Sequence, residues 1–251
     1  MIKKYFLIIG TFALLAITTS CKDDKSSNKK SNNAEITDLK KIPEVDETTV
    51  VTKKNPTDFI PKNFVVFDTI YGDLNKDGLD DCVLIIKGTD KSKVIIDEYR
   101  GELDRNRRGI IVLLNKKGSY ELFTKNESCF SSENEDGGAY YAPELEVEIT
   151  KEKLFISYAY GRYGYWQYMF RLQDNDLALI GYDSSSNNGP VVNVETSINF
   201  LTRKNITNVN TNDDADSGEE VFEKTETKIA RTKLLKLSGI KDFDELRFFD
   251  E

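Results

Sequence analysis

The segment Glu144-Leu-Glu-Val-Glu-Ile-Thr150, followed shortly by Lys153-Leu-Phe-Ile-Ser-Tyr158, decides the fold class of this chain. Apolar and polar residues alternate in both, and a period of two is that of a β-strand with one face in a core. The same alternation returns in Ser119–Thr124 and in Tyr168–Gln173. Together these segments predict a protein built mainly from β-strands.

Short apolar runs bounded by turn residues add further strands to this prediction. They are Phe64–Phe67, Val83–Ile86 and Gly109–Leu114. Lys116–Gly118 and Gln173–Asp176 are connections of hairpin length. Strands that follow one another without helical crossovers form antiparallel sheets. We therefore expect an all-β domain with mainly antiparallel sheets, arranged as a sandwich or as part of a propeller.

The last part of the sequence is less regular. Residues 205–220 are polar and begin Asn205-Ile-Thr-Asn-Val-Asn-Thr-Asn, which predicts a mobile insertion before the final element. Thr227–Leu237 fits either a last strand or a short helix.

The composition excludes several classes of function. The chain has 251 residues, with Lys+Arg 35 against Asp+Glu 43, and it contains no histidine. Without histidine there is no Ser-His-Asp or Cys-His catalytic pair and no histidine-ligated metal. The formal net charge of −8 repels phosphate backbones and favours cations, so no nucleic acid is expected as a partner.

The first residues have the pattern of a secretory signal. Lys3-Lys4 precedes an apolar run over Tyr5–Ile17, which is shorter than the roughly 20 residues that a membrane-spanning helix needs. Small residues then lead to Cys21. Residues 1–20 therefore resemble the signal peptide of a bacterial lipoprotein, and an ordinary signal peptide is the alternative. The resemblance implies lipidation of Cys21 and an outer-membrane location, on the periplasmic or the outer face.

Residues 21–62 are rich in Lys, Asp, Ser, Asn and Thr and contain no aromatic residue before Phe59. Such a segment buries too little apolar surface to offset its ordering entropy, so we expect a disordered tether. Its opening, Cys21–Lys25, is similar to the acidic export signal of Bacteroidetes lipoproteins on the cell surface. The predicted organisation is a signal over 1–20, a flexible linker over 21–62 and a β-rich domain over 63–251.

The acidic loop over residues 73–81, Asp-Leu-Asn-Lys-Asp-Gly-Leu-Asp-Asp, is the sharpest chemical signal. A hard cation such as Ca²⁺ takes roughly six to eight oxygen ligands, and this spacing supplies oxygens from one short turn. Gly78 permits the bend, and Asp80 is expected to face solvent. The predicted calcium ligands are Asp73, Asn75, Asp77, Asp81 and the carbonyl of Leu79. The alternative is an acidic turn that holds no ion.

The strand–loop–strand unit around this loop resembles the calcium-bearing repeat of integrin-type (FG-GAP) and VCBS propeller proteins. It differs from an EF-hand, because position twelve is Leu84 and the flanking segments are strand-like. Asn212–Gly218 is an imperfect second copy that fits a solvated acidic loop better. A propeller needs several blades, so a complete one is not expected.

The wider chain resembles a family of exported Bacteroidetes lipoproteins that carry a single such loop and have no assigned activity. The resemblance lies in Gly72–Gly78, Arg107–Leu114, Trp166–Gln173, Leu179–Tyr182 and Ser197–Thr202. It implies an exported β domain with one bound calcium ion.

Aromatic residues crowd the segment 158–168. Aromatic side chains on one face of a strand can stack on sugar rings or peptide groups. Tyr160, Tyr163, Tyr165 and Trp166 therefore form a candidate ligand site. Ordinary half-buried sheet positions are the alternative, because tyrosine fits them well. A further candidate loop contains Tyr140-Tyr141.

Two cysteines and a basic cluster leave their roles open. Cys82 and Cys129 both lie in the expected exported domain, where a disulfide can persist. A bridge needs Cα atoms about 4.4–6.8 Å apart, so a disulfide and two inert free thiols are both possible, with Cys129 nearer the surface. Arg105, Arg107 and Arg108 either hold an anion or pair with nearby carboxylates.

These observations predict an exported, lipid-anchored β domain with Ca²⁺ as cofactor and the membrane as a partner through the lipid. We expect it to bind a glycan or protein ligand rather than to catalyse a reaction. The alternative is a carbohydrate-active hydrolase with paired carboxylates, although no pair stands out among the Asp and Glu residues. An inhibitor or immunity-type partner is a third possibility.

Overall fold

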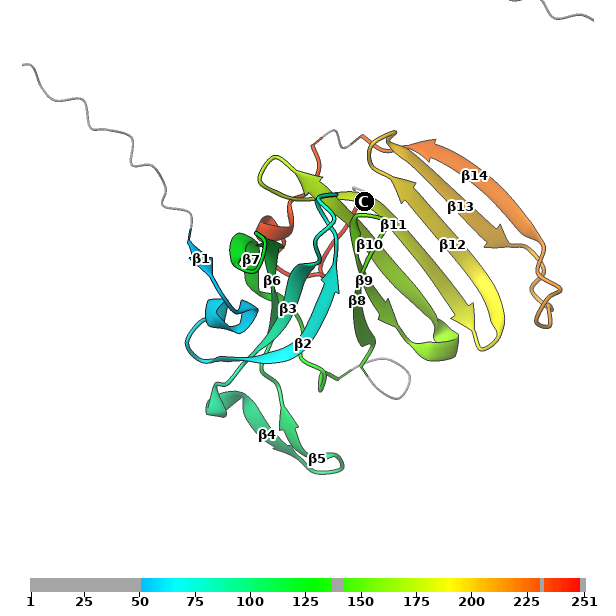
Figure 1. Ribbon diagram of the computed structural model, residues 1–251. Coiled ribbons are helices and arrows are strands. Elements are labelled where there is room, and N and C mark those ends of the chain that lie inside the picture. Colours follow the sequence, from blue (N-terminus) through cyan, green and yellow to red (C-terminus); the bar gives the residue numbers. More distant parts are fainter. Residues whose placement is uncertain (1–50, 137–141, 231–232, 249–251) are drawn as a thin grey trace, which may run out of the picture. The chain divides into compact units, whose positions relative to one another are not determined.

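A computed structural model describes residues 51–136, 142–230 and 233–248 (Figure 1). Strands make up most of this part of the chain, and its helices are 3₁₀ turns of three or four residues. The predicted all-β class with antiparallel pairing is confirmed. In the described ranges no helix is long and apolar enough to cross a bilayer. Residues 1–20, Cys21, most of the predicted linker and Tyr140-Tyr141 lie outside them.

Two antiparallel sheets form the domain. Across the first sheet the strands are β1 (Thr52–Lys53), β7 (Tyr120–Phe130), β6 (Arg108–Asn115), β3 (Asp81–Gly88) and β2 (Phe64–Gly72). The second sheet is a meander of β8 (Glu144–Thr150), β9 (Lys153–Ala159), β10 (Gly164–Gln173), β11 (Asp176–Asn188), β12 (Val191–Asn199), β13 (Lys204–Asn210) and β14 (Phe222–Lys228). A separate hairpin of β4 (Val94–Asp97) and β5 (Gly101–Asp104) extends away from both sheets in Figure 1. The 3₁₀ turns are η1 (Pro56–Phe59), η2 (Lys91–Lys93), η3 (Gly161–Tyr163) and η4 (Leu237–Gly239).

The two sheets pack over a common apolar core, and they have five and seven strands rather than the four of a propeller blade, so the domain is a sandwich. The first sheet contributes Val83, Ile85, Ile110 and Val112, and the second contributes Leu154, Ile156, Tyr158, Tyr168, Phe170, Leu177 and Leu179. The alternation predicted for β9 and β10 is explained by this packing, because every second residue of each strand enters the core.

Strands β3 and β6 are buried on both faces, which explains their unbroken apolar runs. On the outer face, Cys82, Leu84, Ile86, Ile111 and Leu113 form a second, smaller core. Phe59 and Ile60 pack against it, and β1 pairs with β7. The predicted boundary at residue 63 is therefore too late. Residues 51–62 belong to the folded domain because their apolar side chains cover this second core.

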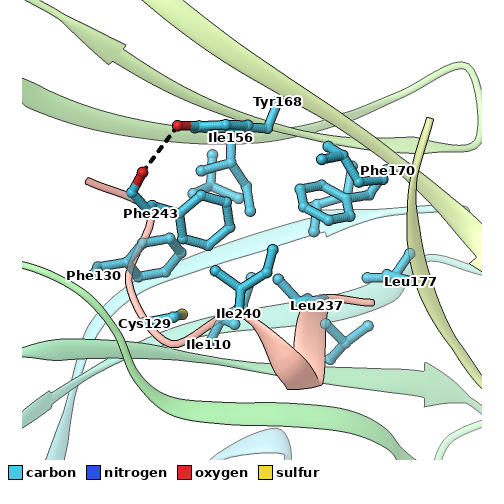
Figure 2. Close-up of a cluster of buried hydrophobic side chains, with 14 of the residues drawn as sticks. Ile110, Cys129, Phe130, Ile156, Tyr168, Phe170, Leu177, Leu237, Ile240 and Phe243 are labelled. Carbon is cyan, nitrogen blue, oxygen red and sulfur yellow. Dashed lines mark hydrogen bonds between the residues drawn. The ribbon is translucent and has the colours of Figure 1, made fainter. Parts of the chain in front are cut away.

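The segment after β14 enters the main core (Figure 2). Leu237, Ile240 and Phe243 are buried between the sheets, beside residues such as Phe130 and Tyr168. The Tyr168 hydroxyl donates a hydrogen bond of 3.0 Å to the Phe243 carbonyl. The single final element predicted over Thr227–Leu237 is wrong: β14 ends at Lys228, and the 3₁₀ turn η4 begins only at Leu237.

The connections between strands agree with the predicted hairpin loops. Asp174 and Asn175 have φ angles of 52° and 61°, the two left-handed residues of a type I′ turn between β10 and β11. Lys117 and Gly118 lie in the connection from β6 to β7 and also have positive φ, at 56° and 99°. These turns match the twist of the strands that they join.

The mobile insertion predicted from residue 205 is wrong in its first part. Lys204–Asn210 is strand β13 and pairs with β12 on one side and β14 on the other. Its β-branched residues, Ile206, Thr207 and Val209, favour a strand although its amides do not. The turn begins only after Asn210, and most residues of Asn212–Gly218 are exposed, as expected for a solvated acidic loop.

Candidate functional site

Trp166 is the central residue of the candidate ligand site and is placed by the register of the second sheet. It lies in β10 directly opposite Tyr158 of β9 and Ser184 of β11. Directly opposite residues share one face of a sheet, so Trp166 lies on the side that carries the main core. Tyr158 is 1% exposed, whereas Trp166 is half-buried. Trp166 therefore stands where the core meets solvent.

Neighbouring rings hold Trp166 in a fixed orientation. Tyr158 stacks on it with ring centroids 5.4 Å apart and planes at 19°. Tyr160 packs against it at 5.0 Å and 54°. Aromatic pairs of this kind contribute about 0.5–1.5 kcal/mol beyond area burial. Because Tyr158 is itself enclosed, the stack anchors the indole to the core.

A hollow of about 370 Å³ lies over these rings. It is lined by all four predicted aromatic residues, Tyr160, Tyr163, Tyr165 and Trp166, and by Tyr182, Ser184, Ser185, Ser186, Val194 and Thr196. A second hollow of about 290 Å³ shares Tyr160, Trp166 and Tyr182 with the first and extends to Asp244 and Arg247. The structure thus brings the predicted aromatic residues together at one site.

Strands β11 and β12 supply the part of this site that sequence reasoning missed. Ser184 lies opposite Trp166, and Thr196 lies opposite Ser184. Within the described residues, neither hydroxyl has a hydrogen-bond partner, unlike that of Tyr163, to which Arg162 donates at 3.3 Å. The sequence did contain a signal for these residues. Tyr182 and Ser184 are two apart in β11, so they share one face of the strand that pairs with the aromatic strand β10.

The predicted calcium loop joins β2 to β3 and is organised by its own side chains. The Asp73 carboxylate accepts hydrogen bonds from the backbone N–H of Lys76 at 2.7 Å and of Gly78 at 2.9 Å. Gly78 has a φ of 81°, the left-handed conformation that the predicted bend requires. Asp80 is exposed, as expected.

The middle of the loop repeats this arrangement. The side-chain oxygens of Asn75 and Asp77 each accept an N–H bond of 2.9 Å, from Asp77 and Leu79 respectively. The Asn75 amide also donates to Asp77 at 3.0 Å. Each of these oxygens keeps a further lone pair after accepting one N–H. The loop can therefore still offer several oxygens to a hard cation.

Asp81 differs from the other loop carboxylates because it is fully buried, with 0% exposure. Its oxygens accept N–H bonds from Leu74 and Asn115, both of 2.9 Å. Burial raises the pKa of Asp81 above its ordinary value, and the negative charges of Asp77 and Asp73 raise it further. Among the described residues Asp81 has no cationic partner, so its ionised form is costly in the folded state.

The loop does not form a closed metal centre by itself. Within the described ranges, no group of three acidic or cysteine side chains converges in a way that would hold a metal ion. The predicted set includes three such side chains, Asp73, Asp77 and Asp81, and in this structure they do not converge in that way. The Asn75 amide and the Leu79 carbonyl are the other two predicted ligands. Calcium at this loop stays a prediction.

The two described cysteines are free thiols, so of the two possibilities that the sequence left open, the disulfide is wrong. Cys82 belongs to the outer core of the first sheet and Cys129 to the main core. The sheet itself separates them. Cys129 is also not near the surface, because its exposure is 0%. Burial raises the pKa of the Cys82 thiol to about 11 and that of Cys129 further.

The basic cluster is engaged by the protein itself. Arg105 pairs with Glu135 at 3.2 Å and with Asp136 at 2.8 Å, Arg107 pairs with Asp242 at 2.8 Å, and Arg108 donates to the Ser131 carbonyl at 2.9 Å. These contacts favour pairing with carboxylates over an anion site, although the partners are more distant in sequence than expected.

Comparison of the chain with known protein families, with curated proteins and with solved structures finds no match. The site is therefore interpreted from its own geometry.

Proposed function

We propose that this protein is an exported, lipid-anchored binding domain whose ligand lies in the hollow around Trp166. The observation that carries the proposal is the gathering of Tyr160, Trp166 and Tyr182 beside Ser184 and Thr196, whose hydroxyls have no hydrogen-bond partner among the described residues. Rings offer apolar faces, and hydroxyls both donate and accept. A ligand with apolar faces and polar edges, as sugar rings have, fits such a surface.

The charges around the hollows favour binding over hydrolysis. A glycosidase needs two carboxylates about 5–10 Å apart, one of them with a raised pKa. Among the described lining residues of both hollows, Asp244 is the only carboxylate. Asp81, whose pKa is raised, is fully buried and is not among them. Within the described residues, these two hollows therefore lack the carboxylate pair that the hydrolase alternative requires.

The binding proposal is tested with the full chain, purified in detergent, on an array of glycans and peptides. Tyr160→Ala and Trp166→Phe should weaken capture of any retained ligand, because each removes ring surface from the hollow. A central aromatic contact is typically worth about 2 kcal/mol, or roughly thirtyfold in affinity. Tyr99→Ala is the matched control, because Tyr99 is 89% exposed on the β4–β5 hairpin. Ligands retained equally by all four proteins, or cleaved on incubation, would contradict the proposal.

We further propose that the loop over residues 73–81 binds Ca²⁺ and that the ion stabilises the sandwich. Asp81 supports this, since a cation would compensate its buried charge and the repulsion from Asp77 and Asp73. The loop lies between β2 and β3, and the Asp81 carboxylate also accepts the N–H of Asn115, where β6 ends. Ion binding would therefore strengthen contacts within the first sheet.

The calcium proposal is tested by thermal unfolding in calcium and in chelator. An extracellular module can bind at roughly 10⁻⁴–10⁻³ M, and a hundredfold excess over the dissociation constant adds about 2.7 kcal/mol to stability. Asp77→Ala should abolish this gain while costing little in chelator, because Asp77 is exposed. Asp80→Ala is the control and should retain the gain. An unchanged wild-type midpoint would mean that the loop is only an acidic turn.

A further inference from the structure

Beyond the main core both faces of the second sheet reach solvent, so the face that carries the core in β9 and β10 is uncovered there. Figure 1 shows β12, β13 and β14 extending away from the first sheet. In β12 and β13 only Ile198 and Asn205 are buried, and every residue of β14 is exposed. This uncovered face continues from the hollow around Trp166, which reaches as far as Thr196 in β12.

Strand register places a row of hydroxyl residues on this face. Ser184 lies opposite Trp166 in β10, and the row continues outward from strand to strand. Its further members, each opposite the one before, are Thr196 in β12, Thr207 in β13 and Thr225 in β14. Directly opposite residues lie on one face, so the row starts at the indole and crosses the sheet at right angles to its strands.

Charged residues are segregated to the other face of these strands. Two further rows of directly opposite residues lie on the same face, one on each side of the hydroxyl row. The first row is Tyr182, Ile198, Asn205 and Thr227, and the second is Ser186, Val194, Val209 and Glu223. On the other face the paired positions include Asp183, Glu195, Lys204, Lys224, Glu226 and Lys228. Glu223, at the outer edge, is thus the only charged residue in these registers on the hydroxyl face. In a chain with 31% charged residues, such a face lacks attraction for an ionic ligand.

We propose that the hydroxyl face of β11–β14 binds an uncharged polysaccharide chain, whose leading sugar stacks in the hollow at Trp166. This inference rests on the proposed function and adds the class and extent of the ligand. Ser and Thr hydroxyls can each donate and accept, which matches the hydroxyls of successive sugars. Adjacent strands are about 4.8 Å apart, so the row from β10 to β14 spans roughly 19 Å. A chain of several sugars is needed to cover it.

A peptide fits this face less well than a glycan. Extended peptides usually add to a free sheet edge through main-chain hydrogen bonds. Strands β11, β12 and β13 are paired on both sides along the hydroxyl row, so they offer no such edge. The free edge is β14, where Glu223, Lys224, Glu226 and Lys228 hinder strand addition.

Trp166 makes the test direct, because it is the only tryptophan of the chain. The full chain is titrated with linear neutral oligosaccharides of graded length while indole fluorescence is followed. Acidic oligosaccharides and an uncharged Gly/Ser/Asn peptide serve as the contrasting probes. We expect a saturable change with a neutral glycan, and an affinity that rises with chain length. No change with any neutral glycan would overturn the inference, as would tighter binding of the acidic probe or the peptide.

Variants separate this inference from the proposed function. Thr207→Val, which lies beyond the hollow, should weaken binding of long chains about threefold to tenfold through the lost hydrogen bond and leave short ones unaffected. Ser197→Ala, on the opposite face of β12, is the control and should have no effect. If Tyr160→Ala weakens a ligand but chain length and Thr207→Val do not matter, the hollow binds alone and only the extended face is refuted. If glycans bind with no dependence on Tyr160, the proposed function itself fails.

Discussion

At the scale of single residues, Asp81 carries an unfavourable charge at a position that the fold needs. Its carboxylate satisfies the buried N–H groups of Leu74 and Asn115, which an apolar residue would leave unpaired. The same burial raises its pKa. The Asp81 carboxylate is therefore favourable as a hydrogen-bond acceptor and unfavourable as a buried negative charge. A bound cation would compensate the charge and leave the hydrogen bonds in place.

This conflict predicts a pH dependence of stability. Folded Asp81 keeps its proton to a higher pH than in the unfolded chain, where its pKa is near 3.8. At pH values between the unfolded and the folded pKa of Asp81, the folded state binds more protons than the unfolded state. The free energy of unfolding therefore falls as the pH rises through this range. Asp81→Asn should lack this fall in chelator. Urea unfolding of both proteins across this pH range gives the difference between their free energies of unfolding. Contributions of the other carboxylates are common to both proteins, so they cancel in this difference.

Calcium should reverse this behaviour, because the ion favours the ionised carboxylate. In saturating calcium the wild type should therefore not lose stability over the same range. If wild type and Asp81→Asn change in parallel in chelator, the carboxyl of Asp81 does not titrate abnormally and the argument for a compensating cation is lost.

At the scale of elements, the C-terminal segment acts as part of the core. Phe243 is 1% exposed, stacks on Phe130 at 5.1 Å and meets Tyr168 edge-on at 4.9 Å. Asn126 donates to the carbonyls of Leu237 at 2.9 Å and Ile240 at 2.6 Å. The segment is thus fixed by both apolar burial and hydrogen bonds from β7.

We therefore expect Phe243→Ala to lower the free energy of unfolding by about 3–5 kcal/mol, the cost of a large buried cavity. Phe222→Ala is the matched control, because Phe222 is 42% exposed in β14, and it should change stability by less than about 0.5 kcal/mol. Denaturant unfolding gives both values. Equal small effects would mean that the segment is docked only loosely.

Periodicity predicted those elements that bury one face, and it failed where burial is irregular. The strands β9 and β10 alternate because they line one core, so they were predictable. Strand β13 was missed because neither of its faces is strongly apolar, and only Ile206, Thr207 and Val209 indicate a strand. The C-terminal segment does carry a signal, since Leu234, Leu237, Ile240, Phe243 and Leu246 recur every third residue. A spacing of three matches neither the period of two of a strand nor the period of 3.6 of a helix. In the structure it places apolar side chains in a core that other elements form.

Some residues of the candidate site could be predicted from the sequence and others could not. The aromatic residues on and before β10 were found because they are adjacent in sequence. Ser184 and Thr196 were not, because their relation to Trp166 exists only through strand pairing. The sequence could not decide between a disulfide and free thiols for a related reason: which face of a sheet a cysteine occupies depends on register, and Cys82 and Cys129 occupy opposite faces.

At the scale of the whole molecule, the thiols of the folded domain bear on the proposed anchor. The chain has three cysteines. Cys82 and Cys129 are enclosed in two different cores, and burial keeps the Cys82 thiol protonated with a pKa of about 11. Neither can be acylated without unfolding of the domain. If the protein carries lipid on a cysteine, Cys21 is therefore the candidate among the three.

Cys21→Ala should therefore abolish incorporation of a labelled fatty-acid analogue, and it should release the protein from membranes or leave its signal uncleaved. Cys82→Ala provides the control, because it removes a thiol of the same chain without touching the signal, and its labelling should equal that of the wild type. Labelling is measured on protein from whole cells, with membrane and soluble fractions compared in parallel. Equal labelling of wild type and Cys21→Ala would show that the lipid, if present, is attached elsewhere, and the anchoring proposal would fall.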